Sequence, residues 1–113
     1  MKYSVRPTPT FIKQSERIIA KYPKLSHDLR QYLSDLGVHG VSGKQIPGHN
    51  AFWKDRLPLR PYNIGKSKGL RLICYYTAQH PAIIIPALIY LKSELEAPTV
   101  QMLNDLKKEL ASL

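Results

Sequence analysis

The residues best suited to binding or catalysis lie between Lys44 and Arg71. This stretch carries seven basic residues against one acidic residue, Asp55, which is a net charge of +6. Aromatic side chains are interleaved with these charges at Phe52, Trp53 and Tyr62. Basic groups neutralise phosphates and aromatic faces stack on unpaired bases, so the mixture favours binding of single-stranded or loop RNA. A solvated hairpin whose charges have no specific role is the alternative interpretation.

The remainder of the chain carries much less of the charge. The full sequence has 113 residues and a formal net charge of +9, of which residues 1–43 hold +4 and residues 72–113 hold −1. A chain of this length predicts a single domain over residues 1–113. A basic chain attracts nucleic acid, an anionic membrane or an acidic protein.

Several other kinds of site are not expected. The single cysteine, Cys74, rules out an internal disulfide and a multi-cysteine zinc site, and its apolar neighbours predict a buried thiol. The four histidines lack metal-ligand spacing, so neither a metal nor a cofactor is expected. The segment Gly65–Gly69 resembles a phosphate-binding loop, but it lacks the first glycine and precedes a strand. We identify no Ser-His-Asp or Cys-His arrangement.

The sequence also predicts a cytoplasmic protein without a membrane segment. The opening residues contain no apolar stretch of the kind that a signal peptide requires. The longest apolar run, Ala82–Leu91, includes Pro86 and is too short to cross a bilayer.

The first half of the chain predicts one strand, two helices and a loop. Alternation favours a short strand over Lys2–Arg6. Helical spacing of apolar residues predicts helices over 11–22 and 25–36, which a Tyr-Pro turn joins into a helical hairpin. Three glycines and a proline predict a loop over Val38–Ala51.

The second half predicts three strands and a final helix. Loose alternation predicts a strand over Phe52–Arg60. Pro58 restricts this strand to the edge of the sheet or to a bulge. Leu70–Thr77 is the clearest strand, and Ala82–Leu91 is apolar enough for burial on both sheet faces. Thr99 is expected to cap the last helix.

This order of elements predicts an α+β fold. We expect a twisted antiparallel sheet of about four strands, with the N-terminal helical hairpin on one face, a basic concave face opposite, and a C-terminal helix. Strand alternation places Arg71 with Ile73 and Tyr75, away from Leu70 and Leu72. We therefore expect Arg71 to face outward, so that Arg71→Ala would abolish function and leave the fold intact.

Four segments resemble the RelE/ParE superfamily of toxins, especially its HigB-like branch. The run from Ile64 to Tyr76 is similar to the family's "GKSGGYRVIYY" strand, and Ile89–Glu94 is similar to its "IYxKSE" segment. The opening from Tyr3 to Phe11 resembles "YxVxxTPxF", and Thr99–Leu110 resembles the "LSDEELKKL" helix. The resemblance covers nearly the whole chain.

The resemblance implies a fold of the kind described above and the role of toxin in a type II toxin–antitoxin system. The implied activity is that of an mRNA interferase, a metal-independent and ribosome-dependent endoribonuclease that inhibits translation and arrests growth. The implied partners are the ribosome, mRNA and a cognate antitoxin. An acidic or amphipathic antitoxin segment is expected to cross the basic face or displace the C-terminal helix.

Site residues follow from matching positions in the family's motifs. The resemblance implies four catalytic cations: Arg71, Lys68, Lys66 and Lys92. The expected contacts to RNA are Lys54, Arg56, Arg60, Tyr62 and Tyr90, of which Lys54 and Tyr62 are taken from the basic and aromatic stretch. In this scheme the ribose 2′-OH attacks the adjacent phosphate, Arg71 braces that phosphate, and a lysine whose pKa is lowered by neighbouring cations acts in proton transfer.

The chain departs from the family at two places. The RelE branch has an arginine after the lysine of the last strand, where this chain has Ser93, and it has a tyrosine in the C-terminal segment, which is missing here. The general acid is therefore unassigned, and Tyr90 reads either as a substitute acid or as a core residue. Two other functions stay open: a gyrase poison of the ParE kind that binds a protein and cuts nothing, and an inactive RNA-binding domain.

Overall fold

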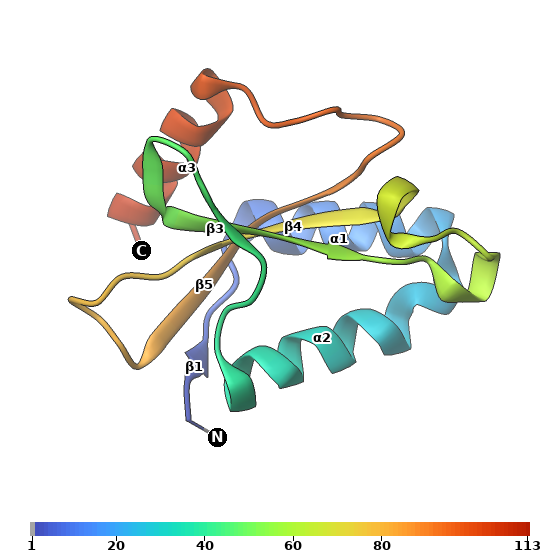
Figure 1. Cartoon of the computed structure of the whole chain (residues 1–113), viewed down its shortest axis with the longest axis horizontal. Helices are drawn as coiled ribbons and strands as arrows, with labels where there is room; N and C mark the ends of the chain where they lie inside the picture. Colours follow the sequence, from blue (N-terminus) through green and yellow to red (C-terminus); the bar gives the residue numbers. More distant parts are fainter. Residues whose placement is uncertain (1) are drawn as a thin grey trace.

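The computed structural model describes residues 2–113, and it contains a five-stranded sheet with helices on both sides (Figure 1). The elements are β1 (Ser4–Val5), α1 (Pro9–Lys21), α2 (Ser26–His39), β2 (Lys44–Ile46), β3 (His49–Leu57), β4 (Leu70–Tyr75), β5 (Ile83–Leu91) and α3 (Val100–Ala111). The strand order is β1-β5-β4-β3-β2. The α+β class is confirmed, but the sheet is mixed because β1 runs parallel to β5 and every other pair is antiparallel.

The fifth strand is β2, in the segment for which the sequence predicted only a loop. Pro47 and Gly48 form a two-residue turn between β2 and β3, and Ile46 pairs with His49 across it. Gly48 has φ 76°, a backbone conformation that favours glycine, and proline before it suits the first central position of the turn. The prediction missed this Pro-Gly signal because β2 is too short to show alternation.

One face of the sheet packs against α1 and α2. Apolar residues of both helices, including Phe11 and Leu29, form a buried cluster with Leu70 and Leu72 of β4 and Ile89 of β5. This set includes the β4 residues that alternation had assigned to the helix side. Cys74 lies in a neighbouring cluster at 2 % exposure, so its predicted burial is confirmed.

The opposite face of the sheet is covered over much of its area by α3. Leu103 and Leu106 of this helix pack with Phe52 of β3, Ile73 of β4 and Leu88 of β5. The expectation of one open basic face is therefore wrong in part. The apolar residues Ile73 and Phe52 form a second core, and only one end of this face is left to the cations.

The strand β5 lies between the two cores. Ile89 faces the first core and Ile84 the neighbouring cluster that holds Cys74, while Leu88 and Tyr90 face the second core, so the predicted burial on both faces is confirmed. The register with β4 shifts beside Pro86, which has no amide hydrogen to donate to the ladder.

A carboxylate of α3 anchors this helix to the start of α1. Thr8 caps α1 by accepting a hydrogen bond from the backbone N–H of Phe11, yet the first turn of α1 has no acidic residue of its own. Glu109 of α3 takes that place, because its Oε2 accepts from the backbone N–H of Thr10 at 3.3 Å and from the Thr10 hydroxyl at 2.8 Å. The negative charge lies at the positive end of the α1 dipole.

We expect Glu109→Gln to lower the free energy of unfolding by about 1 kcal/mol, because the variant keeps the shape and loses the charge at the helix terminus. Urea denaturation of both proteins measures the difference. Lys108→Gln, at an exposed neighbouring position on α3, is the matched control and should change stability by less than about 0.5 kcal/mol. Equal stability of the Glu109→Gln variant and the parent would refute the anchoring role.

Candidate RNA-binding site

A row of polar residues crosses three strands at the end of the sheet face that α3 leaves open. Arg56 of β3 is the cross-strand partner of Arg71 of β4, and Arg71 is the partner of Tyr90 of β5. Directly opposite residues of neighbouring strands point to the same face, with Cα atoms about 4.5–5.5 Å apart. Lys54 lies two residues before Arg56 on this face, and Lys92 lies two residues beyond Tyr90. We call these five residues the basic cluster.

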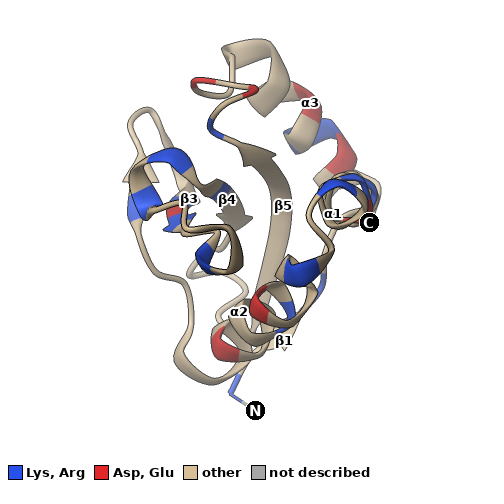
Figure 2. Ribbon diagram, turned by 90° about the vertical axis from the view of Figure 1, so that its right-hand side faces the viewer, with Lys and Arg blue, Asp and Glu red and all other residues tan. Residues whose placement is uncertain are grey.

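Figure 2 shows the lysines and arginines on and around β3 and β4, where blue segments gather with little red among them. This arrangement follows from the register, which brings cations of different strands, 15 to 38 positions apart in the sequence, onto one end of the sheet.

Arg71 is buried, with 4 % of its surface exposed, so the expectation that it faces solvent is wrong. Its Nη1 donates to the carbonyl oxygens of Lys66 at 2.8 Å and Leu70 at 3.2 Å, and its Nη2 donates to that of Ser67 at 3.1 Å. Alternation had placed Arg71 on the correct face, but the loop before β4 folds back over it. Arg71 therefore holds this loop in place.

The charge of Arg71 has no close carboxylate. Within residues 2–113, the ion pairs closer than 4.0 Å join Arg17 to Glu94 and Lys92 to Glu96. The carbonyl oxygens that Arg71 binds carry no formal charge to offset that of the guanidinium, whereas buried charges are normally paired. The cluster therefore has a positive potential that favours an anion such as a phosphate.

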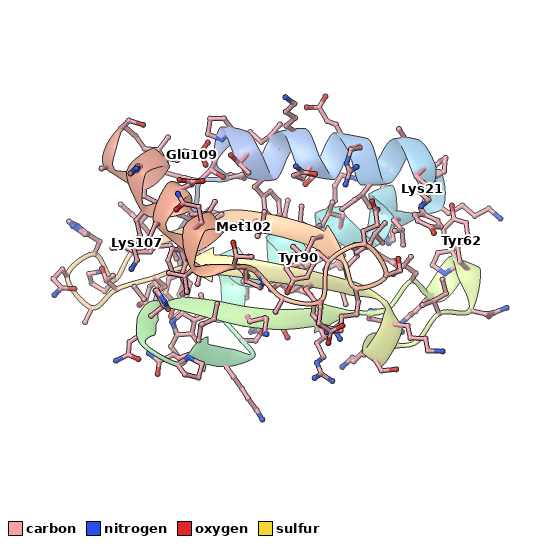
Figure 3. The ribbon with its side chains drawn as sticks, turned by 90° about the horizontal axis from the view of Figure 1, so that it is seen from above. Lys21, Tyr62, Tyr90, Met102, Lys107 and Glu109 are labelled. Carbon is pink, nitrogen blue, oxygen red and sulfur yellow. The ribbon has the colours of Figure 1, made fainter. Side chains whose placement is uncertain are left out.

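Tyr90 has a buried hydroxyl for which residues 2–113 provide no hydrogen-bond partner. The residue is 7 % exposed, and its ring packs with Ile73 and Leu103 in the second core. Burial raises the pKa of the Tyr90 hydroxyl, the positive charge of Arg71 opposes this rise, and Glu96 adds to it. The hydroxyl therefore stays protonated at neutral pH and has a proton to donate. Figure 3 shows Tyr90 near the end of β5, beside the segment that leads from β5 to α3.

Glu96 lies beside the cluster, and the sequence-based reasoning did not select it. Lys92 Nζ donates to the carboxylate of Glu96 at 2.8 Å and to its backbone oxygen at 2.7 Å. The hydrogen bond from Lys92 lowers the pKa of Glu96, with smaller contributions from Arg71 and Lys54. The spacing of four residues between Lys92 and Glu96 was the available signal, although it is usually considered only in helices.

The other predicted site residues lie around the cluster or apart from it. Lys66 and Lys68 are exposed in a short 3₁₀ turn whose carbonyl oxygens Arg71 binds, and Arg60 is exposed in the preceding turn. Tyr62 lies elsewhere: its ring packs edge-on against Tyr22, with centroids 4.9 Å apart, and its hydroxyl accepts from the backbone N–H of Lys24. Figure 3 shows Tyr62 beside Lys21, well away from Tyr90.

The aromatic residues of β3 do not form an open stacking surface. Phe52 is fully buried beneath α3. Trp53 is the partner of Cys74 and points to the opposite face of the sheet, which packs against α1 and α2. Asp55 also lies on the face that packs against α1 and α2. Its carboxylate accepts hydrogen bonds from the hydroxyls of Tyr32 and Ser42 and from the backbone N–H of Arg56. The one acidic residue of the basic stretch is thereby kept off the face that carries the cations.

The environment of Asp55 also affects two neighbouring groups. Burial raises the pKa of the Cys74 thiol to about 12, and the negative charge of Asp55 adds to this rise. Burial likewise raises the pKa of Tyr32 well above its usual range. Both groups therefore stay neutral at physiological pH.

Within residues 2–113, no group of three or more His, Cys, Asp or Glu side chains is arranged to hold a metal ion. No helix in this part of the chain has the length and apolar character needed to cross a membrane. Comparison with known proteins gives no matching family model and no matching curated protein.

Proposed function

We propose that the chain is the toxin component of a type II toxin–antitoxin system and cleaves ribosome-bound mRNA in the cytoplasm without a metal ion. One observation carries the proposal: the register places Arg56, Arg71 and Tyr90 in one row, where, among the residues that the structure describes, the buried hydroxyl of Tyr90 has no partner and the charge of Arg71 has no ion pair. The resemblance to RelE/ParE toxins adds the substrate class and the cognate antitoxin as partner.

The chemistry needs an anion site, a proton donor and a proton acceptor. The ribose 2′-oxygen attacks the adjacent phosphorus, the bond from phosphorus to the 5′-oxygen breaks, and a 2′,3′-cyclic phosphate and a free 5′-hydroxyl form. Lys54, Arg56 and Arg71 supply positive charge for the extra negative charge of the phosphorane. Such fixed charges act most strongly where water is excluded, as it is around Arg71.

Proton transfer in this scheme uses two groups that feel the charge of Arg71. Tyr90 donates a proton to the departing 5′-oxygen, which requires that RNA binding uncovers its buried hydroxyl; the hydroxyl is protonated and, within residues 2–113, bonded to no other group. Glu96 accepts the proton of the 2′-OH, since Lys92 keeps its carboxylate ionised beside the cluster. After this step Glu96 carries the extra proton and Tyr90 lacks one, so the enzyme returns to its starting state when solvent takes a proton from Glu96 and supplies one to Tyr90.

A cleavage assay on ribosome-bound mRNA tests the proposal. We expect cuts that persist in excess EDTA, and we expect Lys54→Ala to slow cleavage by about 10²-fold because one charge near the phosphate is lost. Lys13→Ala, exposed on α1, is the matched control and should cleave at the parental rate. Absence of cuts with both free and ribosome-bound RNA would overturn the proposal, and inhibition of gyrase supercoiling by the same sample would support the poison function instead.

A further inference from the structure

A cleft lies between α2 and the end of β3, and its volume is about 650 Å³. One wall is a face of α2 that carries Asp28 and Asp35, which are about two helical turns apart and therefore on the same side of the helix. The other wall is the end of β3 and the turns that follow it, with Arg56, Arg60 and Lys66. Sites for small molecules occupy about 300–1,000 Å³, so the cleft has room for a mononucleotide.

The two walls carry opposite charges that do not pair with each other. Within residues 2–113, no ion pair shorter than 4.0 Å joins a carboxylate of α2 to a cation of the other wall. Figure 2 shows the acidic residues of α2 in red and the basic residues on and around β3 in blue. The cleft can therefore bind a ligand that brings an anionic group to one wall and hydrogen-bond donors to the other.

The three carboxylates that line the cleft differ in what they already bind. The contacts of Asp55 described above use both of its oxygens. Asp35 Oδ1 accepts from the side chain of Gln31 at 3.0 Å. Asp28 is half-buried, and its carboxylate forms no ion pair within residues 2–113. Asp28 is therefore the carboxylate best placed to accept hydrogen bonds from a ligand.

We infer that this cleft binds a guanine nucleotide, with the edge of the base on Asp28 and the phosphate on the basic wall. Guanine has two neighbouring donors on its Watson–Crick edge, N1–H and the N2 amino group, and one carboxylate can accept from both. Adenine, cytosine and uracil each place an acceptor beside their donor, and this acceptor repels a carboxylate. Arginine side chains of the basic wall match the geometry of a phosphate.

The guanine nucleotide has two possible sources, free nucleotide and RNA. Arg56 belongs both to the cleft and to the basic cluster, so the phosphate of a bound nucleotide lies where the two meet. An RNA strand could therefore continue from the cleft into the cluster. In that case, which rests on the proposed function, the cleft adds a preference for guanine to the proposed cleavage.

Titration of the full chain with nucleotides, followed by the backbone amide resonances in NMR spectra, tests the inference. We expect guanosine 5′-monophosphate to shift the resonances of Asp28, Gln31 and Leu57, which line the cleft. Inosine 5′-monophosphate lacks only the N2 amino group and should bind at least about tenfold more weakly, because a hydrogen bond to a charged acceptor is lost. Guanosine, which lacks the phosphate, should also bind at least about tenfold more weakly.

Replacement of single carboxylates gives the matched comparison. Asp28→Asn is expected to reduce the preference for the guanine over the inosine nucleotide to about twofold or less, because the amide has one acceptor where the carboxylate has two. Asp105→Asn makes the same change of charge on α3, outside the cleft, and should keep the parental preference.

An RNA trinucleotide with guanine between two adenines distinguishes the two sources. Its 2′-hydroxyls are methylated, so that it cannot be cut. Tighter binding of the trinucleotide than of guanosine 5′-monophosphate would identify RNA as the source, and the reverse would identify the free nucleotide; both results support recognition of guanine.

The inference is overturned if guanosine 5′-monophosphate does not bind, if the parent binds the inosine or adenosine nucleotide equally well, or if Asp28→Asn keeps the preference. All of these measurements report binding alone. A protein that binds guanine nucleotides and cuts no mRNA would contradict only the proposed function, and one that cuts mRNA without binding them would contradict only this inference.

Discussion

Tyr90→Phe is expected to slow RNA cleavage by about 10²- to 10⁴-fold, because the variant lacks the proposed proton donor. In this structure the substitution removes the hydroxyl and leaves the other contacts of the side chain in place. In the described part of the chain, residues 2–113, the Tyr90 hydroxyl has no hydrogen-bond partner, so its removal breaks no bond there, and the ring keeps its contacts in the second core. We therefore expect the stability of the variant to equal that of the parent within about 0.5 kcal/mol.

Single-turnover cleavage of ribosome-bound mRNA gives the rate, and urea denaturation gives the stability. Tyr75→Phe is the matched control, because Tyr75 lies on the same face of the sheet at the other end of β4. The Tyr75→Phe variant should cleave at the parental rate. A folded Tyr90→Phe protein that cleaves as fast as the parent would remove Tyr90 from the mechanism.

Arg71→Ala is expected to lower the free energy of unfolding by about 2–3 kcal/mol, because three hydrogen bonds from a charged donor are lost. The melting temperature should fall by roughly 10 °C. The turn that carries Lys66 and Lys68 loses its attachment to the sheet in this variant, so RNA cleavage should fall as well. This result would replace the expectation, drawn from the sequence, that the fold is unaffected.

Arg56→Ala is the control for Arg71→Ala. Arg56 lies directly opposite Arg71 on β3 and is exposed, so its removal should change stability by less than about 0.5 kcal/mol. Thermal melting followed by circular dichroism measures both variants. Equal melting temperatures for the two would show that the contacts of Arg71 with the loop contribute nothing to stability.

The contrast between these two arginines shows which features of the site could be predicted from the sequence and which could not. Alternation placed Arg71 on the correct face of the sheet, and family motifs selected the cations of three strands. Burial of Arg71 was not predictable, because it arises from a loop that folds over the strand and offers its carbonyl oxygens. Charge alone suggested an exposed residue, since buried arginines are uncommon.

The packing of Tyr62 and of α3 could not be predicted from the sequence either. Tyr62 stands among basic residues in the sequence, but a turn at Arg60–Tyr62 directs its ring to Tyr22. The apolar face of α3 was visible in the sequence, but not which sheet face it would cover. That choice depends on contacts between segments far apart in the chain, such as Leu103 with Phe52 and Glu109 with Thr10.

The contact of Asp55 with the backbone N–H of Arg56 also bears on how copies of the chain behave toward one another. The pairing of β2 with β3 ends at Lys54, so no strand within residues 2–113 lies on the outer side of Asp55–Leu57. An open edge of this kind invites strand addition and aggregation. Here the carboxylate of Asp55 accepts from the backbone N–H of Arg56 at 2.8 Å, and Pro58 follows directly. The edge therefore offers an incoming strand few free donors, and the charge of Arg56 repels a second copy that approaches edge to edge.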